Sequence, residues 1–363
     1  MYYDNKKRLI QSKSTNHLNG MEEEYIAYNF TGQPTKKMHV HSATGKTTQT
    51  EYYTYEYDPA GRLLKTKHKL NSGNEVLLAD NSYDELGRLK STKSNNQDKL
   101  AASYTYNVRS WLSTIRHYHF HEDLTYSYNG NITAVQWTQG GKPRKYAYTY
   151  DGLSQLKSAA YTGIGSEKYN TAYTYDKHGN MKTVQRYGRK DAGTGASSYS
   201  VVDQLTFNHN GNQLIWADDT APNITYAASA DFKDKKTVNG TIEYTYNLNG
   251  AMRSDLNKGI TEIQYNSLNL PISIEVDSDH AKGRIKYTYS ASGAKLKTIH
   301  ETDMSLLAAP MMGIGTMASS APKIETTDYV ANKIYENGTL KRILIDGGYI
   351  EGGTYHFYAA NHL

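Results

Sequence analysis

The chain has 363 residues, a formal net charge of +5 and no cysteine, so a disulfide framework and a thiolate metal site are excluded. The positive charge is spread along the chain and forms no concentrated basic face, so no nucleic-acid partner is expected. No window reaches the roughly 18 apolar residues of a spanning helix, so no membrane span is expected. The first residues, MYYDNKKRLI, lack the apolar region of a signal peptide.

Tyrosine dominates the aromatic residues, with 34 Tyr against 5 Phe and 3 Trp. A tyrosine buries its ring while its hydroxyl reaches water or a hydrogen-bond partner. Tyr, Thr and Ile favour half-buried pleated surfaces, so the composition favours strands.

An aromatic residue followed by Asp, Asn or Ser recurs twelve times along the chain. Most spacings are 19 to 29 residues, and the longer ones, of 32 and 39, flank Phe207 and suggest a degenerate unit near NITYAASADF. Such a period is typical of repeat architectures. The anchors are Tyr3-Asp4, Tyr28-Asn29, Tyr57-Asp58, Tyr83-Asp84, Tyr106-Asn107, Tyr128-Asn129, Tyr150-Asp151, Tyr175-Asp176, Phe207-Asn208, Tyr246-Asn247, Tyr265-Asn266 and Tyr289-Ser290.

Each anchor predicts a strand, a tight turn and a second strand. The residues before it alternate, as in YEYD and YTYN, which is the period of a half-buried strand. Gly follows three positions after the anchor's polar residue in seven units, which suits a hairpin turn that needs a left-handed residue. The predicted turn residues are Asp58, Gly61, Asp84, Gly87, Asp151, Asp176, Gly179, Asn208, Gly211, Asn247, Gly250 and Gly293. The tyrosines predicted to line up between hairpins are Tyr55, Tyr57, Tyr104, Tyr106, Tyr126, Tyr128, Tyr148, Tyr150, Tyr173, Tyr175, Tyr244, Tyr246, Tyr287 and Tyr289.

A lone hairpin is marginal in water, so the units must stack sideways to bury their apolar faces. We therefore expect an all-β fold in which residues 1–300 form about twelve stacked hairpins. Residues 301–325 form a Met-, Ala- and Gly-rich apolar stretch, read as a long loop because Pro310 and Pro322 oppose a helix. An adaptable contact surface for a partner or cargo is the alternative for this stretch. Residues 326–363 form a separate terminal segment.

Two groups of polar residues are candidates for a site. His117, His119 and His121 would share one face of a continuous strand, but three such residues span about 13 Å, too far for one Zn²⁺ ion. The turn carboxylates could be read as Ca²⁺ ligands or catalytic pairs, yet Asn or Ser replaces Asp at about half the anchors, which suits turn formation. We predict no catalytic residue, no metal and no cofactor.

The pattern in YEYDPAGRLL and SYDELGRLKS resembles the YD repeats of RHS proteins and of the teneurin YD-shell. The resemblance runs from Tyr3 to about Leu363, and GGYIEGGTYHFYAANHL looks like the start of the RHS-associated core. It implies a β-spiral that forms part of a hollow shell. It also implies a structural role, in which the shell encloses or displays a covalently linked C-terminal toxin or effector in bacterial competition, outside the cell or at its surface.

Two alternatives stay open from the sequence. Exposed tyrosines stack well on sugar rings, so a carbohydrate or cell-surface binding module is one of them. An orphan RHS fragment without cargo, which would remain in the cytoplasm, is the other. The resemblance carries no catalytic residue onto this chain, because the family's autoproteolytic aspartates follow the matched motif.

Overall fold

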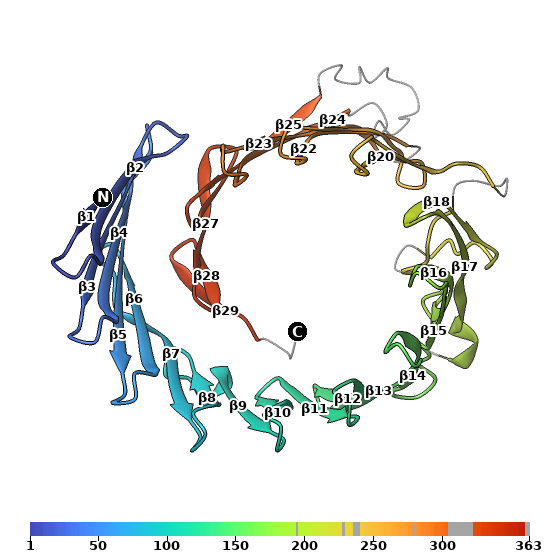
Figure 1. Ribbon diagram of the computed structural model, residues 1–363, viewed down its shortest axis with the longest axis horizontal. Coiled ribbons are helices and arrows are strands. Elements are labelled where there is room, and N and C mark those ends of the chain that lie inside the picture. The colour runs from blue at the N-terminus through green and yellow to red at the C-terminus, as the bar shows by residue number, and fades with distance from the viewer. Residues whose placement is uncertain (194, 227–228, 235–239, 279–280, 304–321, 360–363) are drawn as a thin grey trace, which may run out of the picture. The chain divides into compact units, whose positions relative to one another are not determined.

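The computed structural model describes residues 1–193, 195–226, 229–234, 240–278, 281–303 and 322–359. These residues form antiparallel strands joined by short turns (Figure 1). No α-helix occurs among them, and the helical pieces there are the short 3₁₀ turns η1 (Asp98–Leu100) and η2 (Ala196–Ser198). The predicted all-β fold of stacked hairpins is confirmed.

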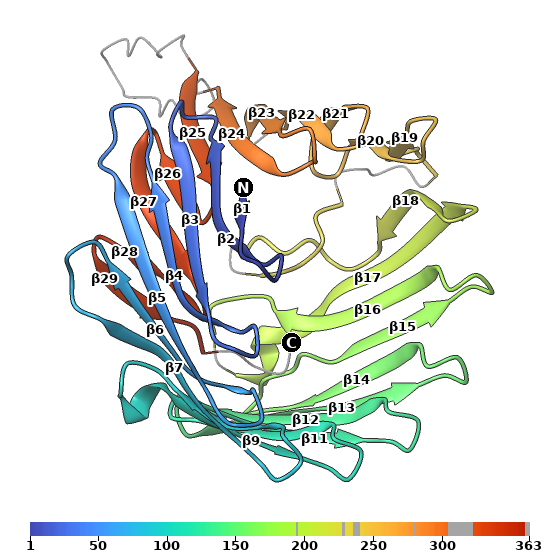
Figure 2. The same cartoon turned by 60° about the vertical axis from the view of Figure 1, so that its left-hand side comes forward.

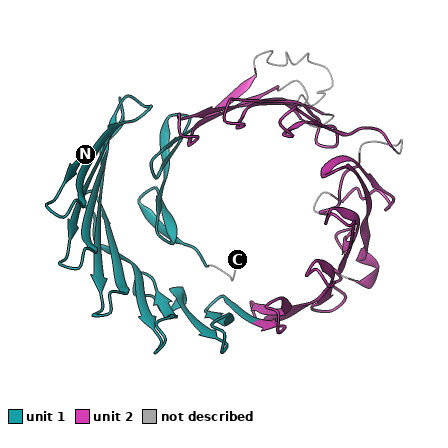
Figure 3. Cartoon of the chain, viewed as in Figure 1, with its two compact units in different colours: residues 1–123, 328–363 teal, residues 124–327 magenta. Residues whose placement is uncertain are grey.

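The chain divides into two compact units (Figure 3). Unit 1 consists of residues 1–123 and 328–363, and unit 2 consists of residues 124–327. Unit 1 therefore joins the first repeats to the last part of the chain. The expected long loop at 301–325 falls mostly on 304–321, which lie outside the described residues, while strands reach Thr302 and begin again at Lys323.

The strands β1 to β11 pair in chain order, each with the strand that follows it. Figure 2 shows the long strands β3 to β6 side by side. The C-terminal strands β26 to β29 likewise pair in order with one another. The strands of unit 1 are β1 (Tyr2–Tyr3), β2 (Leu9–Thr15), β3 (Met21–Tyr28), β4 (Pro34–His41), β5 (Gln49–Tyr57), β6 (Leu63–Leu70), β7 (Val76–Tyr83), β8 (Leu89–Lys93), β9 (Ala101–Tyr106), β10 (Leu112–His117), β26 (Lys333–Glu336), β27 (Thr339–Ile345), β28 (Gly348–Glu351) and β29 (Thr354–Phe357), and β11 (Phe120–Tyr126) and β25 (Lys323–Val330) each include residues of both units.

Unit 2 repeats the same arrangement, with β12 to β18 and then β19 to β24 each pairing with the following strand. Its strands are β12 (Ile132–Gln139), β13 (Lys142–Tyr150), β14 (Leu156–Thr162), β15 (Thr171–Tyr175), β16 (Met181–Arg189), β17 (Tyr199–Asn210), β18 (Gln213–Asp219), β19 (Tyr244–Tyr246), β20 (Met252–Asp255), β21 (Ile260–Tyr265), β22 (Pro271–Asp277), β23 (Lys282–Tyr289) and β24 (Lys295–Thr302).

The register explains why the sequence alternates before each anchor. In β5 and β6, Tyr55 pairs with Thr66, and the register then shifts by one residue between Glu56 and Tyr57. The same shift precedes Tyr150, Tyr175 and Tyr289. A β-bulge of this kind increases the local twist and redirects the side chain that follows it. It places the anchor tyrosine at the strand end, beside the neighbouring hairpin.

The apolar core of unit 1 lies between β5, β7 and the C-terminal strands. Tyr53, Leu78, Ile343, Ile345 and Ile350 form a buried cluster there. The C-terminal strands therefore pack on the side-chain face of the N-terminal sheet, and the site described below lies beside this cluster.

Candidate functional site

Most repeat turns are closed by the same set of hydrogen bonds. At the turn opened by Asp58, the N–H of Gly61 donates to the Asp58 carbonyl oxygen at 2.9 Å, and the N–H of Arg62 donates to Asp58 Oδ1 at 2.8 Å. The φ of Gly61 is +84°, a conformation that glycine adopts readily. The hydrogen bond from the Arg62 backbone lowers the pKa of Asp58. This carboxylate therefore stabilises the turn that Asp58 opens.

The same backbone bond closes most of the predicted turns. It joins Gly87 to Asp84, Ser154 to Asp151, Gly179 to Asp176, Gly250 to Asn247 and Gly293 to Ser290. Sequence reasoning missed three residues at the left-handed position, Lys7, Ser110 and Ser154, with φ values of 63°, 61° and 62°. The turn therefore imposes the conformation even where the residue is not glycine.

Two predicted positions are corrected by the structure. Asn208 opens no turn: it lies within β17 opposite Trp216, because the connection to β18 is a two-residue turn that contains Gly211. Tyr128 lies in a turn and is 94% exposed, because in this unit the turn is opened by Ser127, whose carbonyl accepts from Gly130. Tyr126, at the end of β11, takes the strand position instead.

The remaining predicted tyrosines occupy alternate strand positions on one face. In each pair the two tyrosines are buried or half-buried, while the residue between them is more exposed, as at Tyr104 and Tyr106 or Tyr173 and Tyr175. Rings of a pair lie near each other, with centroids 6.3 Å apart for Tyr287 and Tyr289. Other members of this face are Tyr55, Tyr148 and Tyr244.

The second tyrosine of the pair joins its hairpin to the preceding one. The hydroxyl of Tyr57 donates to the carbonyl oxygen of Pro34 at 2.9 Å, and Pro34 is the first residue of the strand after the preceding turn. Burial raises the pKa of Tyr57 and keeps its hydroxyl a donor. Equivalent bonds of 2.5 to 3.0 Å are made by Tyr28, Tyr83, Tyr106, Tyr150, Tyr175, Tyr246, Tyr265 and Tyr289.

The arginine of the Gly-Arg-Leu step contacts both its own turn and the next hairpin. Arg62 Nε donates to Asp58 Oδ2 at 2.6 Å, and its guanidinium lies 4.9 Å from the ring centroid of Tyr83. Arg8 and Arg88 repeat this arrangement over Tyr28 and Tyr106. A cation over an aromatic face is favourable, so this side chain adds to the contact between hairpins.

The histidines at 117–121 do not lie on one continuous strand. His117 ends β10, Tyr118 and His119 form a turn, and β11 begins at Phe120. His121 pairs with Arg116, whereas His117 pairs with Phe120, so the two imidazoles point to opposite faces. Among the residues that the structure describes, no group of three or more His, Asp and Glu could hold a metal ion.

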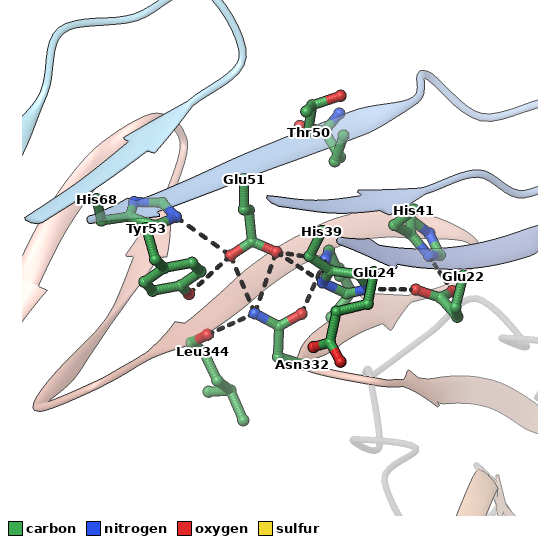
Figure 4. A network of polar contacts seen from close by, with 12 residues as sticks. Glu22, Glu24, His39, His41, Thr50, Glu51, Tyr53, His68, Asn332 and Leu344 are labelled. Atoms are coloured by element: carbon green, nitrogen blue, oxygen red, sulfur yellow. Dashed lines mark hydrogen bonds and ion pairs between the residues drawn. The ribbon is translucent and has the colours of Figure 1, made fainter. Parts of the chain in front are cut away.

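The most distinctive polar site of the described chain joins the two parts of unit 1 (Figure 4). Lys333 on β26 forms an ion pair with Glu51 on β5, and both side chains are 0% exposed. Asn332 donates from Nδ2 to Glu51 Oε2 at 3.0 Å and accepts from the Lys333 ammonium at 2.8 Å. Removing two charges from water is costly unless they are paired and hydrogen-bonded, as they are here.

Two histidines extend this network to tyrosines of the C-terminal strands. His41 contacts Glu22 at 2.5 Å and the hydroxyl of Tyr335 at 2.8 Å. His68 contacts Glu51 at 3.3 Å and the hydroxyl of Tyr355 at 2.8 Å. Each imidazole therefore connects a carboxylate of the N-terminal sheet to a tyrosine that lies about 290 residues later in the chain.

The carboxylates of this network stay ionised in spite of their burial. Burial opposes the charged form of Glu22, but hydrogen bonds from His39, His41 and Asn16 outweigh it and lower its pKa to about 2. Burial also opposes charge on Glu51, and there His39, His68 and Lys333 hold the pKa well below its usual value. The network is therefore a set of mutually satisfied charges.

A groove of about 500 Å³ that is open to solvent adjoins the network. It lies between the sheet and the C-terminal strands and is lined by Glu22, Glu24, Tyr53, Tyr55 and Asp346, among others. Of its lining groups, His39 contacts Glu22 at 2.7 Å, and Lys37 forms an ion pair with Glu24. The arrangement supports docking between two parts of the chain.

Sequence reasoning missed this site. The alternation of His39 and His41 on β4 is visible in the sequence, but polar residues at alternate positions normally indicate a solvent-facing strand. Their partners are almost 300 residues away, and Lys333 carries no motif. Nothing in the local sequence indicates that a lysine is fully buried.

No family model and no curated protein matches the chain. Several solved structures do match the chain. It is similar to the crystal structure of TcdB2-TccC3-TEV, with 16% identity and a TM-score of 0.59, covering 89% of this chain and 15% of that one. It is similar to TcdB2-TccC3-Cdc42, with 15% identity and a TM-score of 0.57, covering 98% and 19%. TcdB2-TccC3 without the hypervariable C-terminal region gives 14% identity, a TM-score of 0.52 and coverage of 93% and 18%.

These likenesses extend over almost the whole chain, and they confirm the RHS/YD-type repeat resemblance at the level of the fold. The chain spans less than a fifth of the length of the structures that it matches. No helix within the described residues is long and apolar enough to cross a membrane.

Proposed function

We propose that the chain is a structural segment of an RHS/YD-repeat shell that shields a covalently linked C-terminal toxin or effector, and that it catalyses no reaction of its own. By the same proposal the complete protein acts outside the cell or at its surface, in competition between bacteria. The fold that the chain shares with TcdB2-TccC3 toxin chains supports this role.

The observation that carries the proposal is the repeated hydrogen bond between hairpins. Nine anchor tyrosines each donate to the preceding hairpin, and Asp–Arg pairs reinforce several of these contacts. Repeated identical contacts distribute stability along a sheet, whereas a catalytic site would concentrate unusual residues at one place. The polar residues at the turns are engaged in closing those turns.

The test is limited proteolysis of the complete native gene product that contains residues 1–363. We expect a polypeptide C-terminal to residue 363 that resists protease while the repeats are folded and becomes cleavable once denaturant unfolds them. A gene product that ends at Leu363, or a C-terminal polypeptide that is cleaved equally fast before and after unfolding, would overturn the proposal.

A further inference from the structure

The C-terminal strands of unit 1 are bound to the N-terminal sheet through side chains. Strands β26 to β29 form their backbone ladder with one another, from Lys333–Ile343 to Glu351–Thr354. The N–H of Leu344 and that of Tyr358 also donate to carbonyls of this region. Residues 328–357, which we call the closing segment, pair along the backbone with one another and, through β25, with β24 of the same sheet. Among the described strands no backbone pairing joins β26 to β29 to the N-terminal sheet, so undocking breaks none of them. The released ladder loses its packing support, and its amides then become exchangeable.

The interface that holds the closing segment combines a small apolar cluster with buried charge. Three of its residues, Ile343, Ile345 and Ile350, belong to the buried apolar cluster, and Leu340, Tyr355 and Phe357 pack against it. Beside them lie the fully buried Lys333 and the nearly buried Tyr335. An apolar contact tolerates sliding, whereas a buried ion pair is satisfied in one position, so charge selects the register of docking.

One edge of this interface is open to solvent. A groove of about 500 Å³ lies between the sheet and the closing segment, and carboxylates line both of its sides. Separation of the segment can therefore begin at a boundary that water already reaches.

We propose that the closing segment docks on and releases from the N-terminal sheet as one element, with its docked position selected by the buried charges centred on Glu51 and Lys333. Release leaves the hairpins of β2 to β10 folded, because their own turns and tyrosine hydrogen bonds do not involve the segment. Glu51 is faced by His39 on β4, His68 on β6 and Lys333 on β26, so its charge is the common partner of three elements. This inference does not depend on the proposed function.

The first measurement uses the unaltered chain. Hydrogen exchange followed by mass spectrometry in increasing urea should show amides of β26 to β29 exchanging at lower urea than amides of β4 to β7. If both sets exchange together at one urea concentration, the closing segment is part of a single cooperative core and the proposal fails.

The second measurement tests the role of charge. Glu51→Gln and Lys333→Met each leave a buried partner uncompensated, so each should increase exchange of residues 333–357 by about 100-fold or more, without changing residues 132–219 of unit 2. The double variant removes both charges and should recover most of the protection. Lys341→Met is the matched control, because Lys341 pairs with Glu351 in the same segment but is 42% exposed.

The pattern of exchange decides the result. Single variants that leave residues 333–357 as protected as in the original chain would overturn the role of the pair. The role of the pair would also be overturned if the double variant increased exchange of residues 333–357 by at least as much as the two single variants do together. Should a variant fail to fold, the urea series on the unaltered chain still decides whether the segment releases separately.

Discussion

The hydroxyl of Tyr57 lies 2.9 Å from the carbonyl oxygen of Pro34, and this hydrogen bond joins one hairpin to the preceding one. It explains why the chain uses tyrosine where phenylalanine would bury the same ring. The carbonyl belongs to Pro34, the first residue of β4, and the hydroxyl reaches it from Tyr57 at the end of β5. The excess of tyrosine in the composition is therefore a property of the contacts between hairpins.

Replacing Tyr57 by phenylalanine should destabilise unit 1 by about 1–2 kcal/mol, because the ring stays packed while the Pro34 carbonyl loses its donor. Chemical denaturation of the variant measures the effect. Tyr52→Phe is the matched control on the same strand, since Tyr52 is 41% exposed and its ring contacts Lys69. Equal losses for the two variants would show that the hydroxyl of Tyr57 has no special role.

A substitution at the left-handed position of a turn should instead increase stability. Ser154 has a φ of 62°, which is strained for a residue with a Cβ, so Ser154→Gly should stabilise unit 2 by about 0.5 kcal/mol despite the entropy cost of glycine. We expect a rise in Tm of about 1–2 °C. Gly152→Ala in the same turn should also stabilise unit 2, by about 0.5 kcal/mol, because a Cβ at Gly152 meets nothing within 4 Å and alanine restricts the unfolded chain. A lower Tm for Ser154→Gly would contradict this account.

The apolar cluster of unit 1 can be tested with a pair of leucines. Leu78 is 3% exposed and contacts the cluster that includes Ile343, so Leu78→Ala should cost about 2–5 kcal/mol and weaken docking of the closing segment. Leu86 lies in a turn and is 74% exposed, so Leu86→Ala should change stability by less than about 0.5 kcal/mol. Denaturation curves of the two variants give the comparison. A similar cost at both positions would mean that the cluster does not hold the segment.

The sequence was sufficient to predict the hairpin, because the signals are local. The alternation before Asp58 and the glycine at 61 lie within one turn and two strands, and the structure has both there. The prediction was wrong where two nearby residues could each open the turn. Ser127 and Asn129 are both suitable, and Ser127 is the one that opens it. At 117–121 the alternating histidines concealed a two-residue turn, since neither Gly nor Pro marks it.

The docking site could not be predicted in the same way. Glu51 and Lys333 are 282 residues apart, and each is an ordinary charged residue of a strand in its local context. Their burial depends on how the closing segment folds back within unit 1. A repeat pattern specifies contacts between neighbouring hairpins, whereas this contact joins segments that are not neighbours in the repeat.

Acid should destabilise unit 1 through the carboxylate of Glu22. The pKa of Glu22 is about 2 in the folded chain and 4.5 when unperturbed, so Glu22 contributes stability above pH 4.5 that is lost as the pH falls toward 2. The loss should be on the order of 2–3 kcal/mol, because protonation of the Glu22 carboxylate removes an acceptor from His39 and His41. Urea unfolding of unit 1 at pH 6, 4 and 3, followed by exchange of residues 333–357, measures it.

Glu22→Gln separates this titration from general acid effects. The variant should be less stable than the original chain at pH 6, since the charged contacts with both histidines are lost, but its stability should fall less between pH 4.5 and 3. Glu51 also has a depressed pKa, so it too loses stabilisation below pH 4.5, where its unfolded form takes up a proton. The difference between the two pH profiles is therefore the part of the loss that belongs to Glu22. Parallel pH profiles for the variant and the original chain would show that Glu22 is not the group that titrates.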